Sequence, residues 1–153
     1  MVETAESRLK AMGITLHDVP PPAANYVPSV RVGNLLFVSG QVSGTPGASM
    51  KGKLGHNMSL EQGIEAARLC AINLLSNFRD AVGDLDKIKR IVKLTGFVNC
   101  TPDFEDPHKV INGCSDVLTD VLGDRGKHAR SAVGMASLPL GYAVEVEAIV
   151  EVA

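Results

Sequence analysis

Residues 144–152 alternate, position by position, between small apolar side chains and side chains that are mostly acidic. The apolar positions are Val144, Val146, Ala148, Val150 and Val152, and the positions between them are Glu145, Glu147, Ile149 and Glu151. A period of two is the repeat of a β-strand, whose successive side chains point to opposite faces of a sheet. The stretch therefore predicts a strand, and the rest of the chain must supply its neighbours.

Further strands are predicted upstream of this one. Residues 30–32 and 35–39 flank Gly33-Asn34, and two short apolar runs around a glycine-containing turn indicate a β-hairpin. The segment from Ile88 to Val98 is rich in β-branched residues and long enough for a central strand. Residues 130–136 give one more strand, close in sequence to the last one.

Two long helices lie between these strands. Ser59 can cap the first helix, and Gln62, three residues on, completes a capping box. Asp106 and Pro107 suit the N-cap and first position of the second helix. Gly83 and Gly123 end the two helices. Each helix has an apolar stripe at spacings of three and four, formed by Leu60, Ile64, Ala67, Ala71, Leu74, Phe78 and Ala81 in the first and by Val110, Cys114, Val117 and Val121 in the second.

The order of elements is a β-hairpin, a helix, a strand, a helix and two strands. It predicts a single α+β domain over residues 1–153, with a mixed β-sheet and two helices packed on one face. The other face has no helix to cover its apolar residues. We therefore expect that face to be buried between subunits.

Two segments fall outside this pattern. Residues 1–23 form an N-terminal extension, with a short helix over residues 4–12 and an extended connection at Pro20-Pro21-Pro22, because proline lacks an amide donor. Residues 44–57 contain five Gly or Pro residues and no regular apolar period. They predict a loop, and we expect it to be the most mobile internal segment.

Charge and composition narrow the function classes. The formal net charge of −2 gives no general attraction to the phosphates of nucleic acids. Cys70, Cys100 and Cys114 are odd in number and widely spaced, which favours buried free thiols in a reducing compartment. The acidic N-terminus is unlike a signal peptide, and every apolar run is far shorter than the roughly 20 residues of a membrane span. We expect a cytoplasmic protein without membrane association, metal or cofactor.

Arg130 and Glu145 are the candidate functional pair. Arg130 begins a strand of otherwise small and apolar residues, where its paired donors would match a carboxylate and the small neighbours leave room for a ligand. Glu145 begins the last strand, where its carboxylate could orient a water molecule. The plainer alternative is a cross-strand ion pair between the two residues at a solvated sheet edge.

The residues around this pair resemble the C-terminal signature of the RidA/YjgF family of reactive-intermediate deaminases. The signature comprises Arg130-Ser131-x-Val133, Leu138-Pro139 and residues 144–149, and earlier matching pieces are Tyr26-Val27, Val38-Ser39-Gly40-Gln41, Asp84-Leu85 and Asn112. The resemblance covers about residues 24–152. It implies a chorismate-mutase-like fold of the bacillus type, assembled as a homotrimer with ligand pockets in the clefts between subunits.

The resemblance also implies residue roles. In members that deaminate, an arginine grips the carboxylate of a 2-imino acid, and a glutamate with a nearby backbone carbonyl positions the attacking water. These roles fall on Arg130 and Glu145, while Tyr26, Ser39 and Asn112 match positions that line or support the pocket.

One position departs from the pattern of the family's deaminases. Ala132 stands in the pocket where those members commonly have a cysteine. The expected function is hydrolysis of 2-imino acids to 2-keto acids and ammonia. Two alternatives stay open: a non-catalytic trimer that binds small carboxylates or partner proteins, and, less favoured because of the net charge, an endoribonuclease or translation inhibitor.

Overall fold

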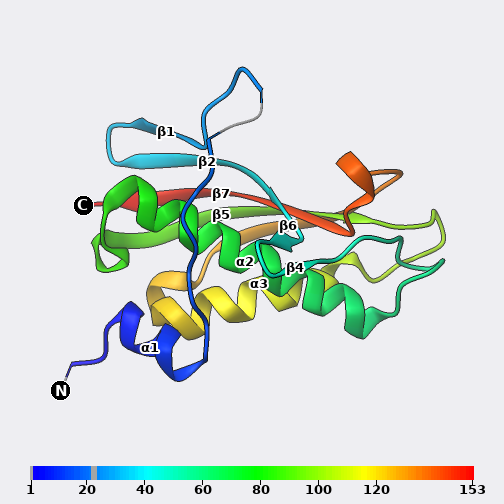
Figure 1. The fold of residues 1–153 in the computed structure, drawn as a ribbon, viewed down its shortest axis with the longest axis horizontal. Coiled ribbons are helices and arrows are strands. Elements are labelled where there is room, and N and C mark those ends of the chain that lie inside the picture. The colour runs from blue at the N-terminus through cyan, green and yellow to red at the C-terminus, as the bar shows by residue number, and fades with distance from the viewer. Residues whose placement is uncertain (1, 22–23) are drawn as a thin grey trace.

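A five-stranded mixed sheet with its helices on one face forms the framework of the computed structural model, which describes residues 2–21 and 24–153 (Figure 1). The strands are β1 (Ser29–Val32), β2 (Leu35–Val42), β5 (Ile88–Asn99), β6 (Ala129–Met135) and β7 (Val144–Val152), in the order β1-β2-β7-β5-β6. β5 and β6 are parallel, and the other neighbours are antiparallel. The predicted α+β class and mixed sheet are confirmed.

The alternating C-terminal stretch becomes β7, at the centre of the sheet. Its apolar residues Val144, Val146, Ala148, Val150 and Val152 are all buried on the helix-covered face. Each buried valine stabilises the fold by about 1.5–3 kcal/mol relative to an exposed one. The intervening side chains, Glu145 among them, therefore lie on the face without helices, which we call the open face.

The first long helix is α2 (Leu60–Val82), and its predicted capping box is present. The Ser59 hydroxyl accepts from the amide of Gln62, whose side chain accepts from the amide of Ser59. The helix buries more than the single stripe predicted, with most of residues 69–78 buried, and Ala81 is exposed instead of buried. The reason is tertiary: α2 packs against the sheet, α3 and the N-terminal segment.

The second long helix, α3 (Pro107–Leu122), begins at the predicted proline, although Asp106 makes no side-chain cap hydrogen bond. Its predicted stripe of Val110, Cys114, Val117 and Val121 is fully buried. All three cysteines are buried free thiols, as predicted. Burial raises the pKa of Cys114 to about 12, so this thiol stays protonated and unreactive at neutral pH.

The N-terminal extension packs onto the helical layer. α1 (Ala5–Ala11) is capped by Thr4, and Leu9 and Leu16 join the core. The extended segment that follows crosses α2 before it reaches β1 (Figure 1). Pro22 and Ala23, which complete the predicted connection, lie outside the described residues. Three 3₁₀ turns connect later elements: Leu85–Lys87, Gly123–Gly126 and Pro139–Gly141.

Residues 44–57, predicted as a loop, contain two short strands and are hydrogen-bonded to the rest of the fold. They begin with a hairpin of β3 (Gly44–Thr45) and β4 (Ala48–Ser49). Leu54 is 0% exposed, and its backbone bonds to Asn99 and Thr101 on both sides. The Lys53 ammonium donates to the Asn99 side chain and to the carbonyl of Ala136, each at 2.6 Å. The predicted loop is thus docked on the end of the sheet, because one apolar side chain reaches the core.

The open face of the sheet is markedly apolar at its edges. Val30, Val32 and Phe37 are about half exposed there. Leu35 is slightly less exposed, and Val133, across the sheet, is as exposed as Phe37. None of the helices within residues 2–21 and 24–153 combines the length and apolarity that a membrane span requires.

Candidate functional site

Arg130 projects from β6 onto the helix-covered face and is held against α3. Its backbone partner on β5 is Leu94, a core residue, which fixes the face on which the side chain lies. The Nη1 group donates to Asn112 Oδ1 at 2.9 Å and to Ser115 Oγ at 3.2 Å, and Nη2 donates to the carbonyl of His108 at 3.2 Å. Three hydrogen bonds to one helix therefore fix the plane of the guanidinium.

His128 supports this arrangement from behind. Its Nδ1 lies 2.6 Å from the carbonyl oxygen of Gly126, which can only accept, so Nδ1 carries the proton. Its Nε2 therefore accepts from the Ser115 hydroxyl at 2.9 Å, which leaves the Ser115 oxygen to accept from Arg130. Burial lowers the pKa of His128, and the nearby charge of Arg130 lowers it further, against the opposing effect of the Gly126 carbonyl. The neutral imidazole is thus favoured.

Two donors of Arg130 are left unused by these contacts. A guanidinium has five N–H groups, and the bonds to α3 occupy both hydrogens of Nη1 and one of Nη2. The Nε–H group and one Nη2 hydrogen remain, and a guanidinium grips a carboxylate best through two parallel donors. In the described part of the chain no acidic side chain pairs with Arg130. The alternative of an Arg130–Glu145 ion pair is wrong.

Glu145 lies on the open face, beside a bulge in β2. The bulge falls between Val38 and Gln41, and the bare backbone of Gly40 makes room for the carboxylate, since a Cβ there would collide with it. Burial raises the pKa of Glu145, and the neighbouring charge of Glu147 raises it further. The carboxyl group is therefore a better proton acceptor than an exposed one.

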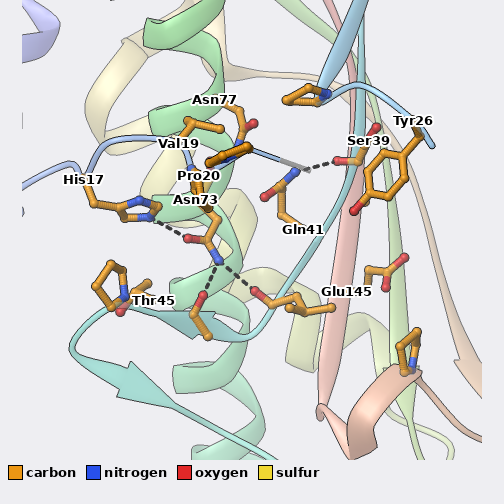
Figure 2. A pocket seen from close by; sticks show the side chains of 17 residues that line it. His17, Val19, Pro20, Tyr26, Ser39, Gln41, Thr45, Asn73, Asn77 and Glu145 are labelled. Atoms are coloured by element: carbon orange, nitrogen blue, oxygen red, sulfur yellow. Dashed lines mark hydrogen bonds between the residues drawn. The ribbon is translucent and has the colours of Figure 1, made fainter. Parts of the chain in front are cut away.

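A cavity of about 520 Å³ opens next to Glu145 (Figure 2). Tyr26 and Ser39 line it, so the structure brings three of the predicted site residues together. The Ser39 hydroxyl donates to the carbonyl of Val27 at 2.8 Å and ties the segment before β1 to β2. Asn112 lies with Arg130 instead, and Ala132 lies two residues along β6 from it, partly buried against the core.

Several residues near Arg130 and in the cavity beside Glu145 were not predicted from the sequence. Ser115 and His128 carry no local signal, because their contact joins α3 to the segment before β6 only in the folded chain. Asn73 and Asn77, in contrast, do carry a local sequence signal. Asparagine is unfavourable inside a helix, and two of them one turn apart within a buried stretch of α2 indicate a polar task. Both line the cavity.

The comparison with known families decides the identity of the fold. A family model described as "YjgF/chorismate_mutase-like, putative endoribonuclease" matches residues 6–152, nearly the whole chain. The chain belongs to this YjgF/chorismate mutase-like family. The resemblance to RidA/YjgF proteins and the chorismate-mutase-like fold are thereby confirmed.

Relatives of this YjgF-like chain match it over nearly their full length. Protein TCP17 of Trypanosoma cruzi is 46% identical over 95% of this chain and 92% of its own. A solved structure of the Agrobacterium tumefaciens protein Atu1372, of unknown function, is 48% identical with a TM-score of 0.91, covering 98% of this chain and 94% of that one. A Shewanella oneidensis protein described as a putative endoribonuclease is 32% identical with a TM-score of 0.93, covering 98% and 100%.

Proposed function

We propose that this YjgF-like protein hydrolyses 2-imino acids to 2-keto acids and ammonia, in clefts between the copies of a homotrimer. The observation that carries the proposal is the pair of unused donors of Arg130, which remain free to bind a carboxylate while α3 holds the rest of the group. No acidic side chain among the described residues pairs with the charge of Arg130. The guanidinium is anchored by neutral groups and keeps its charge available.

Glu145 supplies the second half of the chemistry. A protonated imine is already electrophilic, so the reaction needs a placed water more than a strong nucleophile. Glu145, with a backbone carbonyl, orients that water and takes its proton as the oxygen bonds to the imine carbon. The proton then passes to the amine nitrogen of the carbinolamine. Cleavage of the C–N bond releases ammonia, and the hydroxyl of the carbinolamine gives its proton back to Glu145 as it becomes the carbonyl of the keto acid.

The two halves must come from different copies of the chain. Arg130 lies on the helix-covered face and Glu145 on the open face of the same sheet. A cleft between two copies can present the Arg130 of one and the Glu145 of its neighbour to one ligand. The half-exposed apolar residues of the open face supply a surface for such an assembly.

Ala132 and the buried cysteines fit the same proposal. Ala132 provides no thiol, and its small side chain leaves space beside Arg130, so the hydrolysis relies on Arg130 and Glu145. Three buried free thiols suit the reducing cytoplasm, where we place the protein.

The direct test generates 2-imino acids in situ with an amino-acid oxidase and follows their decay to keto acid. We expect the protein to accelerate this decay, Arg130→Ala to abolish the acceleration, and Glu145→Gln to abolish it while keeping affinity for the keto acid. Arg68→Ala and Glu65→Gln, which break an exposed ion pair on α2, are matched controls. Affinity for keto acids without acceleration would instead show a binding protein. Cleavage of RNA by repurified protein, without imine hydrolysis, would show an endoribonuclease.

A further inference from the structure

The cavity beside Glu145 has a second wall that the imine chemistry does not use. This wall is formed by α2 and by the extended segment around Val19 and Pro20 (Figure 2). Asn77 lies in it, with its side chain beside Pro20 on the side of α2 that faces Gln41. Asn77 is only 4% exposed. The wall therefore holds a polar side chain that is almost fully withdrawn from solvent.

Asn77 has an acceptor without a donor. Its Nδ2 donates to the carbonyl of Asn73 at 2.8 Å, which fixes the orientation of the amide. Its Oδ1 is shielded from solvent and has no hydrogen-bond partner among the described residues. An unsatisfied buried acceptor costs about 1–3 kcal/mol, so a donor brought by a ligand would recover this loss.

The neighbouring Asn73 shows what a purely structural asparagine looks like. Its Nδ2 donates to the carbonyls of Val42 at 2.9 Å and Gly44 at 2.6 Å, and its Oδ1 lies 2.6 Å from Nε2 of His17. All of its hydrogen-bonding groups are engaged, and they tie α2 to β2, to the hairpin and to the N-terminal segment. Asn77 differs because its Oδ1 accepts no hydrogen bond from any other described residue and so links no two segments.

Further unused polar groups of the cavity are two acceptor oxygens, of Gln41 and Glu145, and the hydroxyls of Tyr26 and Thr45, which can donate or accept. Gln41 donates through Nε2 to the carbonyl of Ser39 at 3.0 Å, which leaves its Oε1 without a bond in the described residues. Glu145 adds a carboxylate, and no Lys or Arg is among the described residues that line the cavity. The rest of the lining is largely apolar, with Val19, Pro20, Pro28 and Pro46 among it. The Glu145 carboxylate, without a lysine or arginine beside it among these residues, disfavours a second anionic group. The wall that holds Asn77 and Gln41 favours hydrogen-bond donors.

We infer that this cavity receives the side chain of the substrate and selects one whose far end donates hydrogen bonds, a primary amide or an ammonium group. The prolines pack against the alkyl part of that side chain, and the oxygens of Asn77 and Gln41 accept from its end. The inference rests on the proposed function for the placement of the imino acid between Arg130 and Glu145. It adds the substrate class: imino acids of amide-bearing or amine-bearing amino acids.

The test compares pairs of similar shape that differ in donors. Imines generated from asparagine and glutamine are set against those from leucine and methionine, with aspartate as the anionic probe. We expect kcat/KM to favour each amide over its apolar counterpart and to be lowest for aspartate. Asn77→Leu, of similar volume, and Gln41→Met, at a partly exposed site, should each lower the amide-to-apolar ratio by about 5–10-fold, the loss of one hydrogen bond. Arg68→Ala should leave the ratio unchanged.

Affinities of the matching keto acids, measured by calorimetry, separate this inference from the proposed function. If no imine is hydrolysed but the amide-bearing keto acid binds more tightly in an Asn77-dependent way, the proposed reaction fails and the substrate class stands. If imines are hydrolysed with leucine preferred over asparagine, or with a ratio that neither variant changes, the substrate class is wrong and the reaction stands. If Asn77→Leu does not fold, Gln41→Met and the wild-type ratios still decide.

Discussion

Arg130 and Glu145 lie on opposite faces of one sheet, two strands apart, with β5 between them. The register places Arg130 beside Leu94 and Glu145 beside Phe97, three residues further along β5. Because successive residues of a strand alternate in direction, an odd separation puts the two side chains on different faces. A single copy of the chain cannot bring both groups to one small ligand.

The first prediction concerns Arg130 itself. Arg130→Ala should weaken keto-acid binding by about one to two decades, which corresponds to the loss of a charged hydrogen-bond partner. Arg130→Lys should also lose much of the affinity, because one ammonium cannot reproduce the planar pair of donors. Calorimetry with Arg68→Lys as the control measures this. A variant that melts early but binds normally would give Arg130 a structural role instead.

The second prediction concerns Ser115, which links Arg130 to His128. Ser115→Ala removes one of the three contacts that orient the guanidinium, and we expect about 3–10-fold weaker keto-acid binding. Ser115→Thr keeps the hydroxyl and should restore most of the affinity. Thermal melting of both variants checks that the fold is intact. Equal affinity of Ser115→Ala and wild type would remove Ser115 from the site.

The third prediction follows from the raised pKa of Glu145. The fold favours the neutral form of the Glu145 carboxyl group, because its pKa is higher in the folded than in the unfolded protein. The stability that this preference contributes is fully present below the unfolded pKa of about 4.3. It is lost as the pH rises through the raised pKa of the folded protein. Glu145→Gln stays neutral and should melt about 1–2 °C higher than wild type at pH 7, a small gain because the side chain is partly exposed.

Low pH is the control for the comparison of Glu145→Gln with wild type. At pH 4 the melting temperatures of Glu145→Gln and wild type should converge, and Glu65→Gln should show no such pH-dependent gain. A Glu145→Gln protein that is less stable than wild type at pH 7 would mean that the carboxylate is satisfied in the fold.

The fourth prediction concerns the segment from Gly52 to Leu54. The amide of Gly52 donates to the carbonyl of Gly141 and the amide of Leu54 to that of Asn99. We expect both amides to exchange slowly. We expect the amide of Gly47, in the turn after Pro46, to exchange faster. Leu54→Ala should expose the segment and destabilise the protein by about 2–5 kcal/mol, the cost of a large-to-small change in a core. Rapid exchange of Leu54 in the wild type would contradict the docking.

Local patterns predicted most of the elements but not how the site is divided. The period-two run gave β7 and its two faces, and the Ser59–Gln62 box gave the start of α2, because both depend on residues close in sequence. The position of Leu54 was missed, because one apolar residue among glycines has no period. The separation of Arg130 from Glu145 was missed because it depends on the insertion of β5 between β6 and β7.

The most direct test of the shared site mixes two inactive variants. Arg130→Ala and Glu145→Gln chains are combined in equal amounts, unfolded, refolded together and assayed for imine hydrolysis. In a cyclic homotrimer about a quarter of the clefts would then pair an intact Arg130 from one chain with an intact Glu145 from its neighbour. We predict that activity returns to about a quarter of the wild-type value per site. A refolded mixture as inactive as its two components would contradict a site shared between copies of the chain.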